Sequence, residues 1–214
     1  MMKKLIYVWV ALFSISSLYA QDNFAKNLLD EVSKKYDSYK TIQSDFTFKA
    51  TNAQGESYSD KGQLFLNKAK QNYHIVLPAQ ELISDGKSVW SVLKEDKEIQ
   101  VTDAENNDQS IGPNNIFTFY RKGYKYISMD DETVDKAGKM NVVELSPIDS
   151  KSNYFKIKVR INKNKHIHDV AIFDKSGAKY TYTIQTLYVN HQIADSHFVY
   201  EKNKFPGMEL VDLR

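Results

Sequence analysis

The chain has 214 residues, with 29 Lys and Arg against 27 Asp and Glu, no cysteine, and 13% aromatic residues. This nearly balanced charge argues against a protein that binds nucleic acid or an anionic membrane, because both partners call for a strong basic excess. The lack of cysteine excludes thiol catalysis, cysteine metal sites and disulfides, so packing alone must hold the core together.

The first twenty residues have the pattern of a secretory signal peptide. Two lysines precede a short apolar run, Leu5–Phe13, and the following stretch ends in Leu-Tyr-Ala at Ala20. The apolar run is too short to span a bilayer as a resident helix. We therefore predict cleavage after Ala20 and export of one domain, residues 21–214, with an uncleaved anchor as the alternative.

A helix is predicted over Asp22–Tyr39, with Asp22 or Asn23 as its cap. Its apolar residues recur at steps of three and four and form one stripe: Phe24, Leu28, Leu29, Val32, Tyr36 and Tyr39. Such a helix either packs in the core or acts as a plug that also lines a pocket, and the periodicity leaves both interpretations open.

The stretch Thr41–Trp90 is predicted to organise the fold as a series of antiparallel strands. Residues 42–50 place apolar side chains on even positions and mostly polar ones on odd positions, which is typical of a strand with one buried face. Asp85 and Gly86 lie between two strand-like runs, which is a strong hairpin signal. Further strands are expected at Gly62–Asn67, Tyr73–Leu77 and Val89–Val92.

A short aromatic helix is predicted over Pro113–Tyr120, with the proline at its first position. It lies between the polar loop Asp103–Ser110 and the sequence Arg121-Lys122-Gly123. This segment is therefore either a movable lid or an ordinary covering helix.

The rest of the chain again favours strands, interrupted by an acidic turn region at Asp130–Gly138. The fold class is therefore mainly β (α+β), with about eleven strands, no parallel crossovers, and two helices across the mouth of a strongly curved antiparallel sheet. The remaining strands are expected at Glu98–Val101, Tyr124–Ile127, Asn141–Leu145, Phe155–Ile161, His168–Phe173, Tyr180–Ile184 and Phe198–Tyr200.

No catalytic motif is present, so we predict no enzymatic activity, no catalytic residues and no cofactor. His166 and His168 lie two residues apart and could share a strand face, but no acidic motif is spaced to complete a zinc site, and we predict no metal. The basic residues of Phe155–Ile161 form either the solvent face of a strand or a docking surface for an acidic partner.

Taken in order, these segments resemble the LolA-like family of periplasmic outer-membrane lipoprotein carriers, over almost the whole chain after residue 20. The resemblance includes Ser44-Asp45-Phe46, Gly62-Gln63-Leu64, the run Ile83–Trp90, and the ending Phe205–Arg214. It implies an unclosed antiparallel β-barrel with helices forming a lid over an apolar cavity. It also implies a periplasmic location.

The resemblance implies a carrier that binds the acyl chains of lipoproteins and shuttles them from the inner to the outer membrane. The implied partners are acylated lipoproteins and an inner-membrane lipoprotein-releasing transporter; the outer-membrane acceptor is unknown, and we expect a monomer. The alternative is a periplasmic module that senses lipid or lipoprotein and signals to a membrane regulator.

The cavity and the lid can be assigned to residues on this basis. A family arginine that latches the lid corresponds to Lys68 here, and the family tryptophan of the third strand corresponds to Tyr73. The lid residues are Ile116, Phe117 and Phe119. The predicted cavity lining is Leu28, Val32, Phe46, Phe48, Leu64, Leu66, Tyr73, Ile75, Trp90 and Val92.

Overall fold

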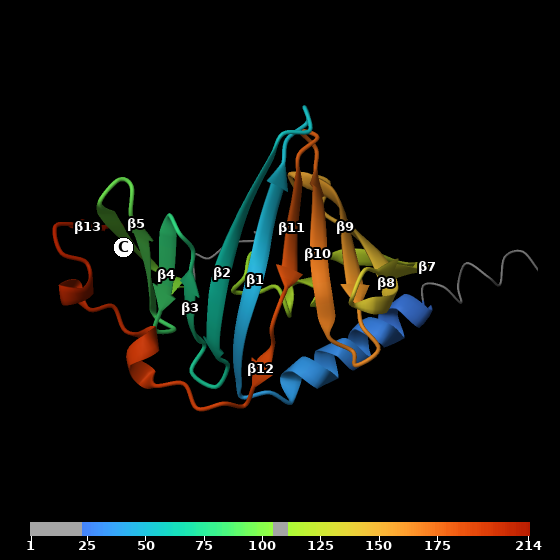
Figure 1. The fold of residues 1–214 in the computed structure, drawn as a ribbon, viewed down its shortest axis with the longest axis horizontal. Coiled ribbons are helices and arrows are strands. Elements are labelled where there is room, and N and C mark those ends of the chain that lie inside the picture. Colours follow the sequence, from blue (N-terminus) through green and yellow to red (C-terminus); the bar gives the residue numbers. More distant parts are fainter. Residues whose placement is uncertain (1–22, 105–110) are drawn as a thin grey trace, which may run out of the picture.

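The computed structural model describes residues 23–104 and 111–214. Figure 1 shows one strongly twisted sheet, with the N-terminal helix lying across the strands of one half. The predicted signal peptide, residues 1–20, lies outside the described residues, as do Asp22 and most of the loop Asp103–Ser110. Within the described ranges, no helix is long and apolar enough to cross a bilayer.

Thirteen strands are present in the described part of the chain, rather than about eleven. They are β1 (Thr41–Thr51), β2 (Ser57–Asn67), β3 (Asn72–Val76), β4 (Gln80–Ser84), β5 (Ser88–Leu93), β6 (Glu98–Asp103), β7 (Tyr124–Val134), β8 (Gly138–Pro147), β9 (Tyr154–Ile161), β10 (Ile167–Asp174), β11 (Lys179–Ile184), β12 (Tyr188–Val189) and β13 (Glu209–Asp212).

The strands form one unclosed sheet, which confirms the predicted fold class. Their order is β13-β6-β5-β4-β3-β2-β1-β11-β10-β9-β8-β7, with β12 beside β1, and the end strands β13 and β7 are not paired with each other. The prediction of a purely antiparallel sheet was wrong at one edge, because β13 pairs parallel to β6 with Leu210 opposite Ile99. This pairing joins segments more than a hundred residues apart, which local patterns do not report.

Within the described residues, one α-helix covers residues 23–37, close to the predicted range. The 3-10 helices with described bounds are η2 (Phe119–Arg121), η3 (Asp195–Phe198) and η4 (Lys202–Lys204). The predicted helix at Pro113–Tyr120 was wrong, because residues 113–118 form turns and only η2 is helical. The predicted strand Phe198–Tyr200 was also wrong, since Phe198 ends η3.

The acidic stretch Asp130–Gly138 is not a turn throughout. Strand β7 continues to Val134, and a register shift between Met129 and Glu132 accommodates the irregular part of the strand. Glu132 then pairs with Lys158 and Arg160 of β9, which explains why acidic residues are tolerated in this strand.

The β1–β2 pair supports the centre of the concave face. Phe46 is 2% exposed and lies opposite Gly62, where a Cβ atom would be 2.4 Å from the Phe46 ring. The glycine therefore makes room for the ring. The predicted Asp85-Gly86 hairpin between β4 and β5 is confirmed, and Gly86 adopts a φ of +87° that L side chains rarely adopt.

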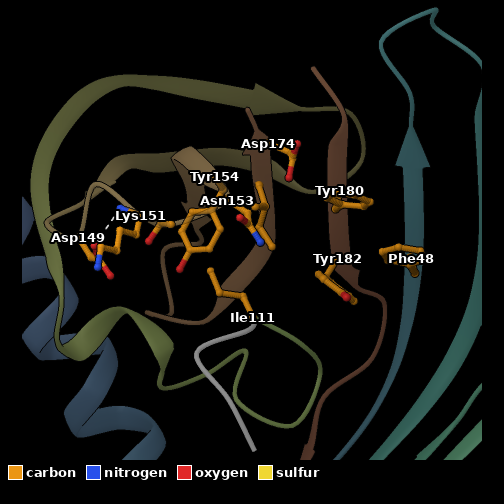
Figure 2. A pocket seen from close by; sticks show the side chains of 11 residues that line it. Phe48, Ile111, Asp149, Lys151, Asn153, Tyr154, Asp174, Tyr180 and Tyr182 are labelled. Carbon is orange, nitrogen blue, oxygen red and sulfur yellow. Dashed lines mark hydrogen bonds between the residues drawn. The ribbon is translucent and has the colours of Figure 1, made fainter. Parts of the chain in front are cut away.

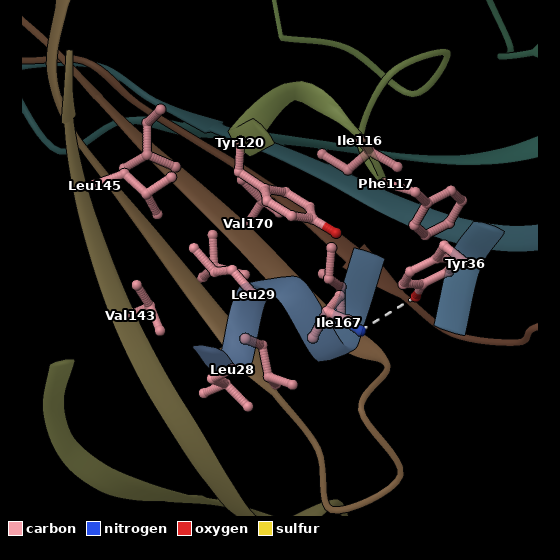
Figure 3. Close-up of a cluster of buried hydrophobic side chains, with 14 of the residues drawn as sticks. Leu28, Leu29, Tyr36, Ile116, Phe117, Tyr120, Val143, Leu145, Ile167 and Val170 are labelled. Carbon is pink, nitrogen blue, oxygen red and sulfur yellow. Dashed lines mark hydrogen bonds between the residues drawn. The ribbon is translucent and has the colours of Figure 1, made fainter. Parts of the chain in front are cut away.

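The part of the sheet from β2 to β6 is covered on both faces. On the concave face, the helix and residues 111–121 pack against the main core, which includes Leu28, Ile116 and Leu145 (Figure 3). On the opposite face, residues 190–208 between β12 and β13, which we call the C-terminal segment, cover β2 to β6. Phe198 of this segment is completely buried, His197 stacks on Phe65 with ring centroids 4.8 Å apart, and Tyr200 stacks on Trp90 with centroids 5.8 Å apart. Apolar alternation in these strands therefore does not by itself identify the concave side.

Candidate functional site

The centre of the concave face is filled rather than hollow. The Tyr36 ring of the helix stacks on Phe117 of the 111–121 segment, with centroids 4.5 Å apart, and the Tyr36 hydroxyl accepts a hydrogen bond from the Ile167 backbone N–H at 3.1 Å (Figure 3). Phe117 is 3% exposed and Tyr36 1%. Open space therefore lies beside this plug rather than beneath it.

The first hollow, of about 510 Å³, lies against β9, β10 and β11. Its walls are Phe48 of β1, Ile172 of β10, and Tyr154, Tyr180 and Tyr182, and Ile111 also lines it (Figure 2). Burial raises the pKa of Tyr182 to about 12, so this side chain is uncharged at physiological pH. The polar residues of the hollow come from its edge: Asp149, Lys151, Ser152, Asn153 and Asp174.

A second hollow of about 460 Å³ adjoins the first, because Ile111, Asp149, Ser152 and Tyr154 line both. Tyr154 forms part of their shared wall and is held by a 2.8 Å hydrogen bond between its hydroxyl and that of Tyr124. Each volume falls within the range of sites that bind small organic ligands.

A third hollow of about 350 Å³ lies on the other side of the 111–121 segment, towards β2 and β3. Leu66, Tyr73 and Phe117 line it, together with Lys68. The segment 111–121 thus borders all three hollows through Ile111, Phe119 and Phe117. We call residues 111–121 the lid segment from here on.

The predicted lining residues are distributed over several places. Phe48 lines the first hollow, and Leu66 and Tyr73 line the third. Phe46 borders a separate hollow beside β2 and β3. The other residues on the concave side are buried in the main core: Leu28, Val32, Leu64 and Ile75.

Trp90 and Val92 were assigned to the wrong face. Residues directly opposite each other on neighbouring strands share a face of the sheet. Trp90 of β5 pairs with Ile83 of β4, Ile83 with His74 of β3, and His74 with Phe65 of β2, so Trp90 is on the same face as Phe65. Phe65 is on the face that the C-terminal segment covers. Val92 follows Trp90 at a spacing of two, so both residues pack under that segment.

The predicted lid residues are brought together, but their environments differ. Ile116 and Phe117 are buried in the main core. Phe119 is only partly buried, lines the second hollow and packs edge-on against Tyr124 at 5.9 Å. Phe119 is therefore the lid residue most directly available to a ligand in the adjoining hollows.

Lys68, the predicted latch residue, contacts the end of the helix. Its Nζ donates a 2.6 Å hydrogen bond to the Tyr36 carbonyl at the end of the helix and is 3.5 Å from Asp37. Asp37 in turn accepts a 2.7 Å hydrogen bond from Arg121, at the end of the lid segment. The Arg121 guanidinium holds the pKa of Asp37 below its usual range, so the pair stays charged at neutral pH.

Asp37 and Arg121 were not predicted from the sequence, because they are 84 residues apart and no local pattern links them. The tyrosines of the first hollow were not predicted either. The alternation over Tyr180–Ile184 placed Tyr180 and Tyr182 on the same face as Ile184, and this signal was sufficient to include them in the lining.

The two histidines have separate partners. His166 Nε2 shares a 2.7 Å hydrogen bond with the Tyr39 hydroxyl, and burial lowers the pKa of His166. His168 pairs with Asp169 at 2.5 Å. Within residues 23–104 and 111–214, no cluster of three or more His, Asp or Glu side chains could hold a metal ion.

The basic residues of β9 are largely paired within the molecule. Lys156 lies 3.3 Å from Glu144, Lys158 pairs with Glu132, and Arg160 Nε lies 2.9 Å from the buried carboxylate of Asp169. The face therefore presents much less free positive charge than the sequence alone indicated. At Lys158 and Arg160, this geometry favours the interpretation of a solvent face over a docking surface for an acidic partner.

Comparison with known proteins identifies the family. The family model described as outer membrane lipoprotein carrier protein LolA matches residues 37–201. No curated protein sequence matches the chain. Among solved structures, an uncharacterized conserved protein from Thermus thermophilus is 9% identical with a TM-score of 0.58, and the match covers 88% of this chain and 98% of that chain. At this identity the similarity is one of fold.

Two further structures were matched at lower TM-scores. A LolA superfamily protein from Nitrosomonas europaea is 14% identical, with a TM-score of 0.43, over 82% of this chain and 97% of that chain. The lipoprotein LppX from Mycobacterium tuberculosis is 11% identical, with a TM-score of 0.48, over 79% of this chain and 98% of that chain. The resemblance read from the sequence is confirmed by the family model.

Proposed function

The chain belongs to the LolA family of outer membrane lipoprotein carriers, and from this membership we propose that it carries lipoprotein acyl chains across the periplasm, from the inner to the outer membrane. The observation that supports the proposal most is the pair of adjoining hollows on the concave face, walled by aromatic and aliphatic side chains and bordered by the lid segment.

The energetics of capture need no charged contact. Each methylene removed from water contributes about 0.8 kcal/mol, so roughly ten methylenes contribute about 8 kcal/mol. A closed, empty lid lowers the net affinity, because opening it consumes part of this gain. Release is therefore easier from a protein whose lid closes well, and no chemical step is required.

The proposed role includes export and processing. The pattern in residues 1–20 matches a signal peptide, and cleavage after Ala20 would deliver residues 21–214 to the periplasm. The working partners are acylated lipoproteins and an inner-membrane lipoprotein-releasing transporter. We propose that the carrier acts as a monomer.

A fluorescent fatty acid tests the proposal. We expect the exported protein to bind the probe at close to one equivalent, and a diacylated lipopeptide to displace it while the same peptide without acyl chains does not. Ser152 lines both adjoining hollows, so Ser152→Trp should weaken probe binding by filling them. We expect the affinity for the probe to fall by about tenfold, which corresponds to roughly 1.4 kcal/mol of binding free energy.

Ser150→Trp is the matched control, because Ser150 is in the same connection and lines neither hollow. Equal probe binding by Ser152→Trp and the parent would place the ligand elsewhere. Absence of probe binding by a folded parent would contradict the carrier function. Co-purification of a membrane regulatory protein in place of lipoprotein would instead favour a sensor.

A further inference from the structure

An aromatic pair with one exposed ring lies on the convex face, just outside the first hollow. Phe155 is 52% exposed, although it is in a strand, and its ring centroid is 6.4 Å from that of Phe173. Phe173 lies directly opposite Lys156 on β9 and Lys179 on β11. The two ammonium groups lie 4.6 Å and 5.3 Å from the centre of its ring.

A bulge explains why Phe155 faces outwards. Phe173 pairs with Lys156, but the next pair along is Asp174 with Tyr154, so Phe155 has no partner in the register. Residues 155, 157, 159 and 161 would otherwise share the buried face, and Ile157, Val159 and Ile161 are fully buried there. The bulge thus turns one large aromatic side chain into solvent.

The Phe155–Phe173 pair lies next to the residues that line the first hollow. Tyr154 precedes Phe155, Asp174 follows Phe173 and Tyr180 follows Lys179, and each of these neighbours lines the first hollow. Alternation along a strand therefore places a hollow-lining residue next to a convex-face residue at the same end of β9, β10 and β11. This end includes the β10–β11 turn and lies at the top of the sheet in Figure 1.

The surroundings carry a small positive excess, with four lysines against three carboxylates when Glu144 is included. The stretches 149–156 and 173–180 contain four lysines and two aspartates: Lys151, Lys156, Lys175, Lys179, Asp149 and Asp174. Glu144 pairs with Lys156, and Lys175 donates to the Ser150 carbonyl. Lys151 Nζ and Lys179 Nζ have no ion pair within the described residues, so both are free to reach an external anion.

We propose that this surface, defined by Phe155, Phe173, Lys156 and Lys179, docks on an anionic phospholipid bilayer and brings the mouth of the first hollow to the membrane. An exposed aromatic ring inserts at the headgroup level, while lysines keep their charge in the anionic layer and lay their methylene stems on apolar surface. The nearly balanced charge of the whole chain gives little long-range attraction. Docking is therefore weak, local and reversible, which suits a protein that must leave the membrane again.

This inference extends the proposed function but is tested separately from it. The protein, purified after export, is mixed with vesicles of phosphatidylcholine alone or with about 30% phosphatidylglycerol as the probe surface, and the bound fraction is measured by sedimentation. We expect binding to the anionic vesicles and loss of that binding in high salt. All variants share the same N-terminus, so any contribution of residues 1–20 cancels.

Phe155→Ser should lower the partition coefficient about tenfold, because an exposed ring can no longer be buried in the interface. Lys179→Gln should lower it about fivefold, since one cation is removed from the surface. Phe24→Ser is the matched control: Phe24 is also 52% exposed but is on the helix, and its substitution should leave vesicle binding unchanged. Fatty-acid probe binding should stay at the parent level in Phe155→Ser, which separates docking from the hollow.

Several results would overturn the proposal. One is equal vesicle binding by the parent and Phe155→Ser. Another is a loss of vesicle binding in Phe24→Ser that is as large as the loss in Phe155→Ser. A parent that binds neither vesicle, or binds both equally, would also refute docking on an anionic surface. A Phe155→Ser variant that keeps vesicle binding but loses contact with a protein would assign the surface to a protein partner instead.

Discussion

Asp37 at the end of the helix accepts a 2.7 Å hydrogen bond from Arg121 at the end of the lid segment. The same carboxylate oxygen is 3.5 Å from Lys68 Nζ, just after the end of β2. One side chain thus links the helix, the lid segment and the sheet. Because the Asp37 side chain is half exposed, each of these contacts is weak in water. We therefore propose that the lid segment opens by breaking them, without unfolding the core.

Removing the Arg121 contact should therefore free the lid segment. We expect Arg121→Gln to bind a fluorescent fatty acid about two- to fivefold faster than the parent in stopped-flow measurements, with a thermal midpoint within a few degrees. Lys26→Gln removes the comparable exposed pair with Asp30 and should leave the rate unchanged. Equal rates in Arg121→Gln and the parent would mean that this pair does not restrain the lid segment.

Lys68→Arg should have the opposite effect. A guanidinium can donate to the Tyr36 carbonyl and the Asp37 carboxylate together, whereas an ammonium is a less directional donor. We expect slower probe association and weaker net affinity. Lys70→Arg is the control, since Lys70 pairs with Asp195 of the C-terminal segment. Faster association in Lys68→Arg would refute the latch.

A charge in the lid segment should act differently at its two aromatic positions. Phe117 is buried against Tyr36, and a carboxylate there costs several kcal/mol, so we expect Phe117→Asp to lower the thermal midpoint by about 10 °C or more. Phe119 is only partly buried at the second hollow, so Phe119→Asp should lose probe binding at a midpoint near that of the parent. A midpoint that falls equally in both variants would make the lid segment a structural element rather than a lid.

The stability should depend on Glu81 in a defined pH range. The hydrogen bond from His74 at 3.2 Å, and then the Lys94 contact at 2.9 Å, lower the pKa of Glu81 to about 2. A carboxyl with a lowered folded-state pKa contributes stability above its ordinary pKa and loses it as the pH falls through the folded value. The contribution, on the order of 2 kcal/mol, is therefore complete above about pH 5 and disappears towards about pH 2.

Urea unfolding of the parent and Glu81→Gln measures this contribution. The difference in unfolding free energy should be largest near about pH 6 and should shrink steadily down to the lowest pH at which the parent still unfolds cooperatively. Glu201→Gln, which removes an exposed pair with Lys204, should show little difference at any pH. A Glu81→Gln difference that stays constant with pH would show that packing, not charge, is lost.

The predictable parts of the fold are those that rest on local patterns. Alternation identified the strand around Phe46, three- and four-residue spacing identified the helix, and Asp85 with Gly86 identified the hairpin. Each of these signals is contained within a short stretch of the chain. Pro113 gave a local helix signal too, but the residues after it fold into turns that place Ile116 and Phe117 in the core.

The parts that could not be predicted depend on distant segments. Trp90 and Val92 have the same apolar character as residues of the concave face, and only the C-terminal segment, through Tyr200, makes their own face a buried one. The parallel pairing of β13 and the Asp37–Arg121 contact likewise join remote residues. The hollows could not be predicted for the same reason, because their walls combine residues of β1, β9, β10, β11 and the lid segment.

Native mass spectrometry of the protein purified from its own cell envelope tests the carrier function most directly. We expect a complex with the mass of one chain plus one acylated lipoprotein, and loss of that complex in Ser152→Trp but not in Ser150→Trp. A bare chain in both the parent and the variants, under conditions where lipoproteins are made and the chain is folded, would contradict it.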